Sequence, residues 1–117
     1  MVKIVNKNGD ISISSEVFLI LAGDAASKCF GVKGMVSQTR ENGLYQLLKR
    51  ENMAKGVSVS FNDDNTASIT LHIAVDYGVN IAVISKSIME EVSYKVTEMT
   101  GVPIKNVDVY VDSVIFD

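Results

Sequence analysis

Between residues 67 and 75, apolar and polar side chains alternate along the chain. The odd positions are all apolar, whereas the even positions include Ser68, Thr70 and His72. Successive side chains of a β-strand point to opposite faces of a sheet, so this pattern predicts a half-buried strand. We expect its odd positions to face the core and its even positions to form the exposed side of the sheet. A covered even face would indicate a protein partner.

Shorter patterns predict further strands. Residues 57–61 also alternate, and the turn-forming residues Asn62–Asn65 join them to the first strand, which predicts a β-hairpin. At the N-terminus, Val2–Val5 is a short β-branched run, Asn6–Asp10 is rich in turn-forming residues, and Ile11–Ile13 predicts a short strand.

The last strand is predicted over Ile104–Phe116. From Val107 to Val111 its apolar positions are odd-numbered, but the next apolar residue is Val114. A shift of one residue turns every later side chain to the other face unless an extra residue absorbs it. We therefore expect a bulge or bend near Asp112 and Ser113.

Two longer stretches have a helical period. The first helix is expected to begin at Ser14 or Ser15 and to end near Phe30. Leu19 and Ile20 widen its apolar stripe until the first two turns are apolar almost all round, which predicts burial by its own domain or by a partner. The stripe itself consists of Val17, Phe18, Leu21, Ala22, Ala25, Ala26 and Cys29.

The second helix has clear signals at both ends. Asn80 is a good N-cap, and Gly101 followed by Pro103 is typical of a C-terminus. Gly31 is the corresponding candidate for a left-handed residue after the first helix. The predicted buried face of the second helix consists of Ile81, Ile84, Ile88, Val92, Val96 and Met99.

These elements predict a single domain, residues 1–117, in the order β-α-(short α)-β-β-α-β. Residues 35–55 have no sustained period, although Leu44–Leu48 suggests one or two helical turns, and we expect this stretch to be the most mobile. Two helices with apolar stripes must bury them against a sheet. The predicted fold is an α+β two-layer sandwich, with two long helices packed on one face of a small mixed or antiparallel sheet.

Composition favours a cytoplasmic protein. The longest apolar run, Val17–Ala22, is far shorter than the ~20 residues needed to cross a bilayer, and the first residues do not form a signal-peptide core. Cys29 is the only cysteine, so an intrachain disulfide is excluded, as is usual in a reducing compartment.

The net charge of −3 is unevenly distributed, because residues 28–55 contain six basic and two acidic side chains. This asymmetry either orients the molecule against an anionic surface or another copy of itself, or is simply an uneven solvated surface. The overall acidity argues against strong nonspecific binding to nucleic acid. The candidate basic surface consists of Lys28, Lys33, Arg40, Lys49, Arg50 and Lys55.

Candidate chemistry is sparse. His72 is the only histidine, and a pair between Cys29 and His72 has no supporting signature. Structural zinc sites need more Cys and His residues than this chain has. Asp76, Asp108 and Asp112 could gather near strand ends, but solvated carboxylates are the simpler interpretation. The sequence therefore predicts no catalytic, cofactor-binding or metal-binding residues and no small-molecule substrate, so we do not expect an enzyme.

Gly31-Val32-Lys33-Gly34 matches the GxxG loop with which KH domains clamp a nucleic-acid backbone. It follows a predicted helix and lies in the basic segment. A glycine-capped helix end explains the same residues. A KH-like RNA-binding module therefore remains the alternative function.

The assembled pattern resembles the alkaline shock protein family of Gram-positive and related bacteria, also described as envelope stress response or general stress proteins. Three stretches carry the resemblance from Gly9 to Phe116, and all three are patterns of strands and caps. They are Gly9–Ser14 with the small residues of the first helix and Gly31-Val32-x-Gly34, Gly56-Val57-x-Val59 with residues 69–78, and Thr100-Gly101-Val102 with the alternating valines of the last strand.

The resemblance implies a non-enzymatic cytoplasmic protein of cell-envelope homeostasis. Some members are held beneath the membrane by a separate, membrane-anchored partner, without inserting into the membrane themselves. We therefore expect a protein that self-associates, as a homo-oligomer, or docks on a protein partner. The over-wide apolar face of the first helix, Phe18, Leu19 and Ile20, is the candidate interaction surface.

Overall fold

The computed structural model describes residues 2–36 and 56–116. The short helix predicted at 44–48 lies outside this range. Within it, the chain forms six strands and two helices. They are β1 (Val2–Asn6), β2 (Gly9–Ile13), α1 (Ser15–Ser27), β3 (Val32–Met35), β4 (Val57–Phe61), β5 (Ala67–Asp76), α2 (Ile81–Thr100) and β6 (Ile104–Ile115).

Strand β5, which has the cleanest alternation in the sequence, is the centre of the main sheet. β6 runs parallel to it along one side. On the other side, β4 pairs antiparallel with Ala67–Leu71 and β3 pairs antiparallel with Ile73–Val75. The described sheet is therefore mixed, and the predicted β4–β5 hairpin is confirmed.

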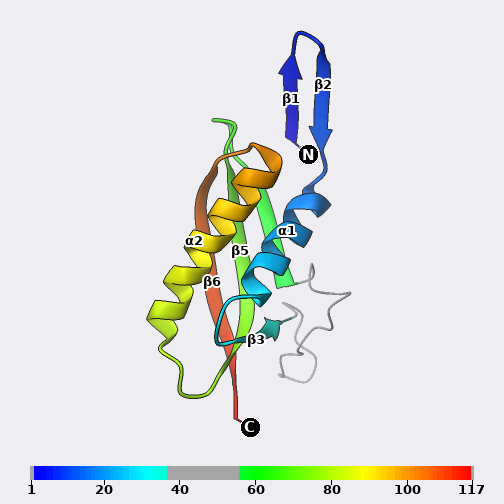
Figure 1. Ribbon diagram of the computed structural model, residues 1–117. Coiled ribbons are helices and arrows are strands. Elements are labelled where there is room, and N and C mark those ends of the chain that lie inside the picture. The colour runs from blue at the N-terminus through cyan, green and yellow to red at the C-terminus, as the bar shows by residue number, and fades with distance from the viewer. Residues whose placement is uncertain (1, 37–55, 117) are drawn as a thin grey trace.

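Both helices cover one face of this sheet (Figure 1), which confirms the predicted α+β two-layer sandwich. The odd-numbered residues of β5 are completely buried beneath them. From α1, Phe18, Ala22, Ala25 and Ala26 enter the same core. The residues of α2 in this core are Ile84, Ile88, Val92 and Val96.

The buried face of α2 differs at its ends from the prediction, because Ile81 and Met99 are exposed. The buried residues instead follow steps of four as far as Thr100. With 3.6 residues per turn, such a stripe rotates by about 40° per step and runs obliquely around the helix. Thr100 is accommodated because its hydroxyl donates to the Val96 carbonyl and accepts from the Val102 amide, at 2.7 and 3.1 Å.

Helix caps are partly as predicted. The Asn80 side chain accepts a hydrogen bond from the Val83 amide, and Gly101 ends α2 in the left-handed conformation. Helix α1 ends at Ser27, three residues earlier than expected, with Lys28 as its right-handed C-cap. Gly31 does have a positive φ of 87°, but it lies in the turn that leads into β3 and is not the cap.

Strand β3 was missed by the sequence analysis, which interpreted Gly31–Gly34 as a helix end or a GxxG loop and found no sustained period from Met35 onward. It has only four residues, and its register with β5 shifts between Val32 and Gly34. A run this short and irregular has too few positions to show a period of two. Met35 and the following Val36 are nevertheless buried.

The first two strands form a separate two-stranded hairpin, which projects beyond the sandwich (Figure 1). The predicted order instead had a single N-terminal strand in the main sheet. Val5 pairs with Asp10 and Asn6 with Gly9, so most of the residues predicted as a turn belong to the ladder.

The predicted bulge in the last strand is confirmed. Ile73 of β5 is opposite Val111, but the next residue, Ala74, is opposite Ser113. Asp112 is therefore the extra residue of β6. Because of it, Val114 lies opposite Val75 and on the same face of the sheet as Val109 and Val111.

We expect Gly31→Ala to destabilise the fold more than Gly78→Ala. Both glycines have positive φ, which costs an L-residue about 1–2 kcal/mol. A Cβ at Gly78 would meet no atom within 4 Å, whereas one at Gly31 would collide with Cδ1 of the buried Ile84. Denaturant unfolding of both variants measures the difference, and equal losses would show that Ile84 moves aside freely.

Candidate functional site

The candidate interaction surface on α1 is only partly exposed. Phe18 was predicted to belong to it but is completely buried, because its ring packs edge to face on Phe61 of β4 at 5.2 Å. Leu19 is half-buried against the core. Ile20 is 54% exposed, and Val17, one turn earlier, is 41% exposed. The open apolar ridge of α1 is therefore Val17 and Ile20.

Of the candidate basic surface, the structure describes Lys28 and Lys33. The Lys28 ammonium lies 3.0 Å from the Asp24 carboxylate, and that of Lys33 lies 3.4 Å from Asp76. The other four residues of this surface, Arg40, Lys49, Arg50 and Lys55, lie outside the described range.

The GxxG match does not form the loop of a KH domain. Gly31 lies in a turn, and Val32 to Gly34 belong to strand β3, where Gly34 is opposite Ala74. The backbone of this segment is therefore engaged with β5, so it cannot serve as an open loop that clamps a nucleic-acid backbone. The KH-like alternative loses its structural basis.

The even face of β5 is less exposed than predicted, and its cover is the chain itself. Ser68 donates a hydrogen bond to Asn106 of β6, with 2.8 Å between the two oxygens. His72 stacks on Tyr110, which lies directly opposite it on β6, with ring centroids 5.0 Å apart. The Asp112 carboxylate lies 2.7 Å from Nδ1 of His72, and the two side chains are only 13% and 19% exposed.

This His72–Tyr110–Asp112 cluster was not predicted. Asp112 reaches the histidine from the bulge in β6, and the sequence predicted a bulge there without showing which strand would be its neighbour. The cluster also excludes the Cys29–His72 pair, because Cys29 packs with the helices on the opposite face of the sheet.

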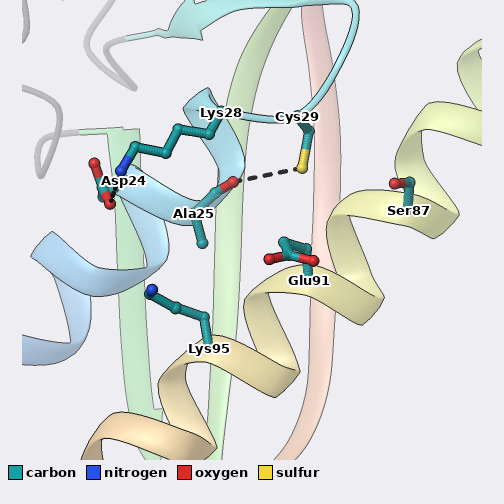
Figure 2. Close-up of a pocket in the computed structure, with 7 residues that line it drawn as sticks. All are labelled: Asp24, Ala25, Lys28, Cys29, Ser87, Glu91 and Lys95. Carbon is teal, nitrogen blue, oxygen red and sulfur yellow. Dashed lines mark hydrogen bonds and ion pairs between the residues drawn. The ribbon is translucent and has the colours of Figure 1, made fainter.

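A small groove between the two helices contains Cys29 (Figure 2). It has a volume of about 230 Å³, below the roughly 300–1,000 Å³ of typical ligand pockets. The Cys29 thiol donates to the Ala25 carbonyl. Burial raises the pKa of the thiol, and the Glu91 carboxylate raises it further. The remaining groups that line the groove are Asp24, Lys28, Ser87 and Lys95.

The three candidate aspartates near strand ends each have a different partner. Asp76 binds Lys33, Asp108 accepts from Asn106, and Asp112 binds His72, so the three aspartates do not converge. Residues 2–36 and 56–116 contain no group of three or more His, Cys, Asp or Glu side chains suited to a metal ion. No helix within the same ranges is long and apolar enough to cross a membrane.

Exposed apolar side chains occur along α2 and at both ends of the molecule, and the sequence analysis missed the two groups at the ends. On the hairpin, Val5 is 72% and Ile11 is 51% exposed. At the far end, Tyr77 and Phe116 are 68% and 71% exposed, with ring centroids 4.5 Å apart, and Phe30 is 89% exposed. Tyr77 directly follows β5 and Phe116 directly follows β6. An aromatic residue just after each strand was the sequence signal for these two residues.

We expect Cys29 to react slowly with iodoacetamide at neutral pH, because its raised pKa leaves less thiolate than an unhindered thiol has. Glu91→Gln should increase the rate only in part, since burial is the larger cause. The pH profile of alkylation measures both effects. A rate equal to that of a free thiol would contradict the packing of Cys29 in the groove.

Comparisons with known proteins agree with the resemblance seen in the sequence. The chain is 37% identical to the uncharacterized protein Spy1614 of Streptococcus pyogenes, covering 97% of this chain and 93% of that protein. It is 33% identical to the uncharacterized protein YloU of Bacillus subtilis, covering 97% and 94%. Among solved structures, MamM CTD H264E is similar in fold alone, with a TM-score of 0.50, 15% identity, and coverage of 84% of this chain and 93% of that one.

The family comparison covers the same length. Residues 3–116 match the model of the alkaline shock protein family, which is described as having a cell envelope-related function. This chain therefore belongs to the alkaline shock protein family.

Proposed function

We propose that this protein serves the cell envelope as a non-enzymatic interaction protein, which self-associates or docks on a protein partner. The observation that carries the proposal is the open ridge of Val17 and Ile20 on α1. The inner side of the same helix is held in the core by Phe18, Ala22 and Ala26. The ridge is thus an apolar surface presented by a rigid element.

The geometry of the ridge supports a role in binding. Residues three apart on a helix are neighbours on its surface, so Val17 and Ile20 form one continuous patch. Their exposed fractions of 41% and 54% leave apolar area that association would remove from water. Each Å² removed contributes about 25 cal/mol, before the cost of lost motion is subtracted.

The distribution of polar groups supports binding over catalysis. In the described range, His72 is held by Asp112 and stacked on Tyr110, and the Cys29 thiol has a raised pKa. These contacts stabilise the sandwich and leave both groups poorly suited to attack a substrate. A membrane-anchored protein partner would account for a role at the envelope, because docking on it would hold the chain beneath the membrane.

A charge on the ridge tests the proposal. Ile20→Glu should abolish self-association in light scattering, or capture of a protein partner from membranes of the native cells, while the melting temperature changes little. Exposed substitutions usually change stability by no more than about 0.5 kcal/mol. Ser60→Glu is the matched control, since it adds the same charge at an exposed position of β4.

Phe18→Ala separates the surface from the core. Removing this buried ring should cost about 3–5 kcal/mol and lower the melting temperature strongly. If Ile20→Glu leaves both self-association and capture unchanged, the ridge is not the binding surface. If it unfolds the protein as Phe18→Ala does, Ile20 belongs to the core.

A further inference from the structure

The turn of the β1–β2 hairpin contains an asparagine followed directly by a glycine, Asn8-Gly9. In this dipeptide the side-chain amide of the asparagine lies next to a backbone nitrogen that no side chain shields. Attack of that nitrogen on the side-chain carbonyl carbon closes a five-membered ring, which is the first step of asparagine deamidation. In a folded protein the reaction requires that both groups can move together.

The side chain of Asn8 can move into position. Asn8 is exposed, and its side-chain amide makes no hydrogen bond to any residue in the described ranges. Its backbone amide donates to the Asn6 side chain at 2.7 Å, which holds the turn without engaging the side-chain amide of Asn8. Apart from its chain neighbours, a Cβ built on Gly9 would meet no atom within 4 Å. The site of ring closure is therefore open.

The Gly9 nitrogen is also within reach, because the ladder around it is weakly held. Gly9 is opposite Asn6 in the last pair of the hairpin, and the ends of a ladder open at a much smaller free energy than its centre. In the described part of the chain, β1 and β2 pair only with each other. An isolated two-stranded hairpin is at best marginally stable in water. The last pair can thus open while the sandwich stays folded.

The other described asparagines lack this combination. Asn65 is the one whose side chain likewise makes no hydrogen bond to a described residue. The residue after it is Thr66, whose β-branched side chain crowds its backbone nitrogen and whose backbone N–H donates to the Asp64 carboxylate at 3.3 Å. The remaining side chains are engaged in hydrogen bonds, and they are those of Asn6, Asn62, Asn80 and Asn106.

We propose that Asn8 deamidates spontaneously in the folded protein, which makes the hairpin turn a modification site. The Gly9 nitrogen forms a bond to Cγ of Asn8, the bond from Cγ to Nδ2 breaks, and ammonia leaves with the proton of the Gly9 amide. Water then opens the resulting succinimide, giving its hydroxyl to the new carboxyl group and its proton to the nitrogen. Cleavage at Cγ gives aspartate, and cleavage at the backbone carbonyl carbon gives isoaspartate. Either product replaces a neutral amide by a carboxylate.

The isoaspartate product changes the hairpin itself. Its main chain runs through Cβ and Cγ, so the turn becomes longer by one methylene group and Gly9 moves out of register with Asn6. The sandwich does not depend on this pairing, because Ile13 is the described hairpin side chain that packs against the core. The reaction does not involve the ridge of α1 and is independent of the proposed function.

Ageing of the whole chain in mildly alkaline buffer tests the proposal. The background carries Asn42→Gln, because Asn42-Gly43 is the same dipeptide. Isoelectric focusing should show the gain of one negative charge, and peptide mapping should place aspartate and isoaspartate at position 8. Asn8→Gln should keep its charge over the same time, since its longer side chain would have to close a less favourable six-membered ring. Asn65→Gln is the matched control and should age like the background.

Hydrogen exchange tests the effect on the hairpin. After separation by anion exchange, the isoaspartate form should exchange the backbone amides of residues 2–13 faster than the unmodified form, with the same melting temperature of the sandwich. Three outcomes would overturn the inference. They are an Asn8 that stays unmodified for as long as Asn65, a reaction at position 8 that occurs only in denaturant, and an isoaspartate form whose hairpin exchanges no faster than before.

Discussion

Burial of the odd face of β5 beneath the two helices is the interaction on which this fold depends. Ile69, Leu71 and Ile73 have no exposed surface, and full burial of such side chains contributes about 1.5–3 kcal/mol each. The same strand pairs with β3, β4 and β6, so it also sets the register of the described sheet. A slip of one residue in β5 would move its apolar side chains out of the core.

The other face of β5 shows how the chain uses its few reactive groups. Ser68, Thr70 and His72 face polar side chains of β6 at matched register positions. The bulge at Asp112 places a carboxylate on His72, and Tyr110 covers the ring. Groups that could serve catalysis elsewhere thus hold two parallel strands together.

What the core leaves uncovered defines the surfaces available for binding. The ridge of α1, the β1–β2 hairpin and the exposed Phe30, Tyr77 and Phe116 lie outside the two-layer core, because a small sandwich has too little interior to bury them. The family to which the chain belongs is described by a cell envelope-related function, and under the proposed function a partner would bind at surfaces of this kind. They lie on helix α1, on the β1–β2 hairpin and near the ends of β5 and β6, and each of these elements is attached to the core at one side.

The sequence by itself determined the features that depend on near neighbours in the chain. The alternation of β5, the β4–β5 hairpin, the caps at Asn80 and Gly101 and the bulge at Asp112 were all predicted, because each follows from the conformation of a few consecutive residues. The tertiary structure decided which side chains meet. It buried Phe18 against Phe61, made a strand of Val32–Met35, and brought Asp112 to His72. These pairs come from different elements, and the periodicity of one element does not contain the identity of its neighbour.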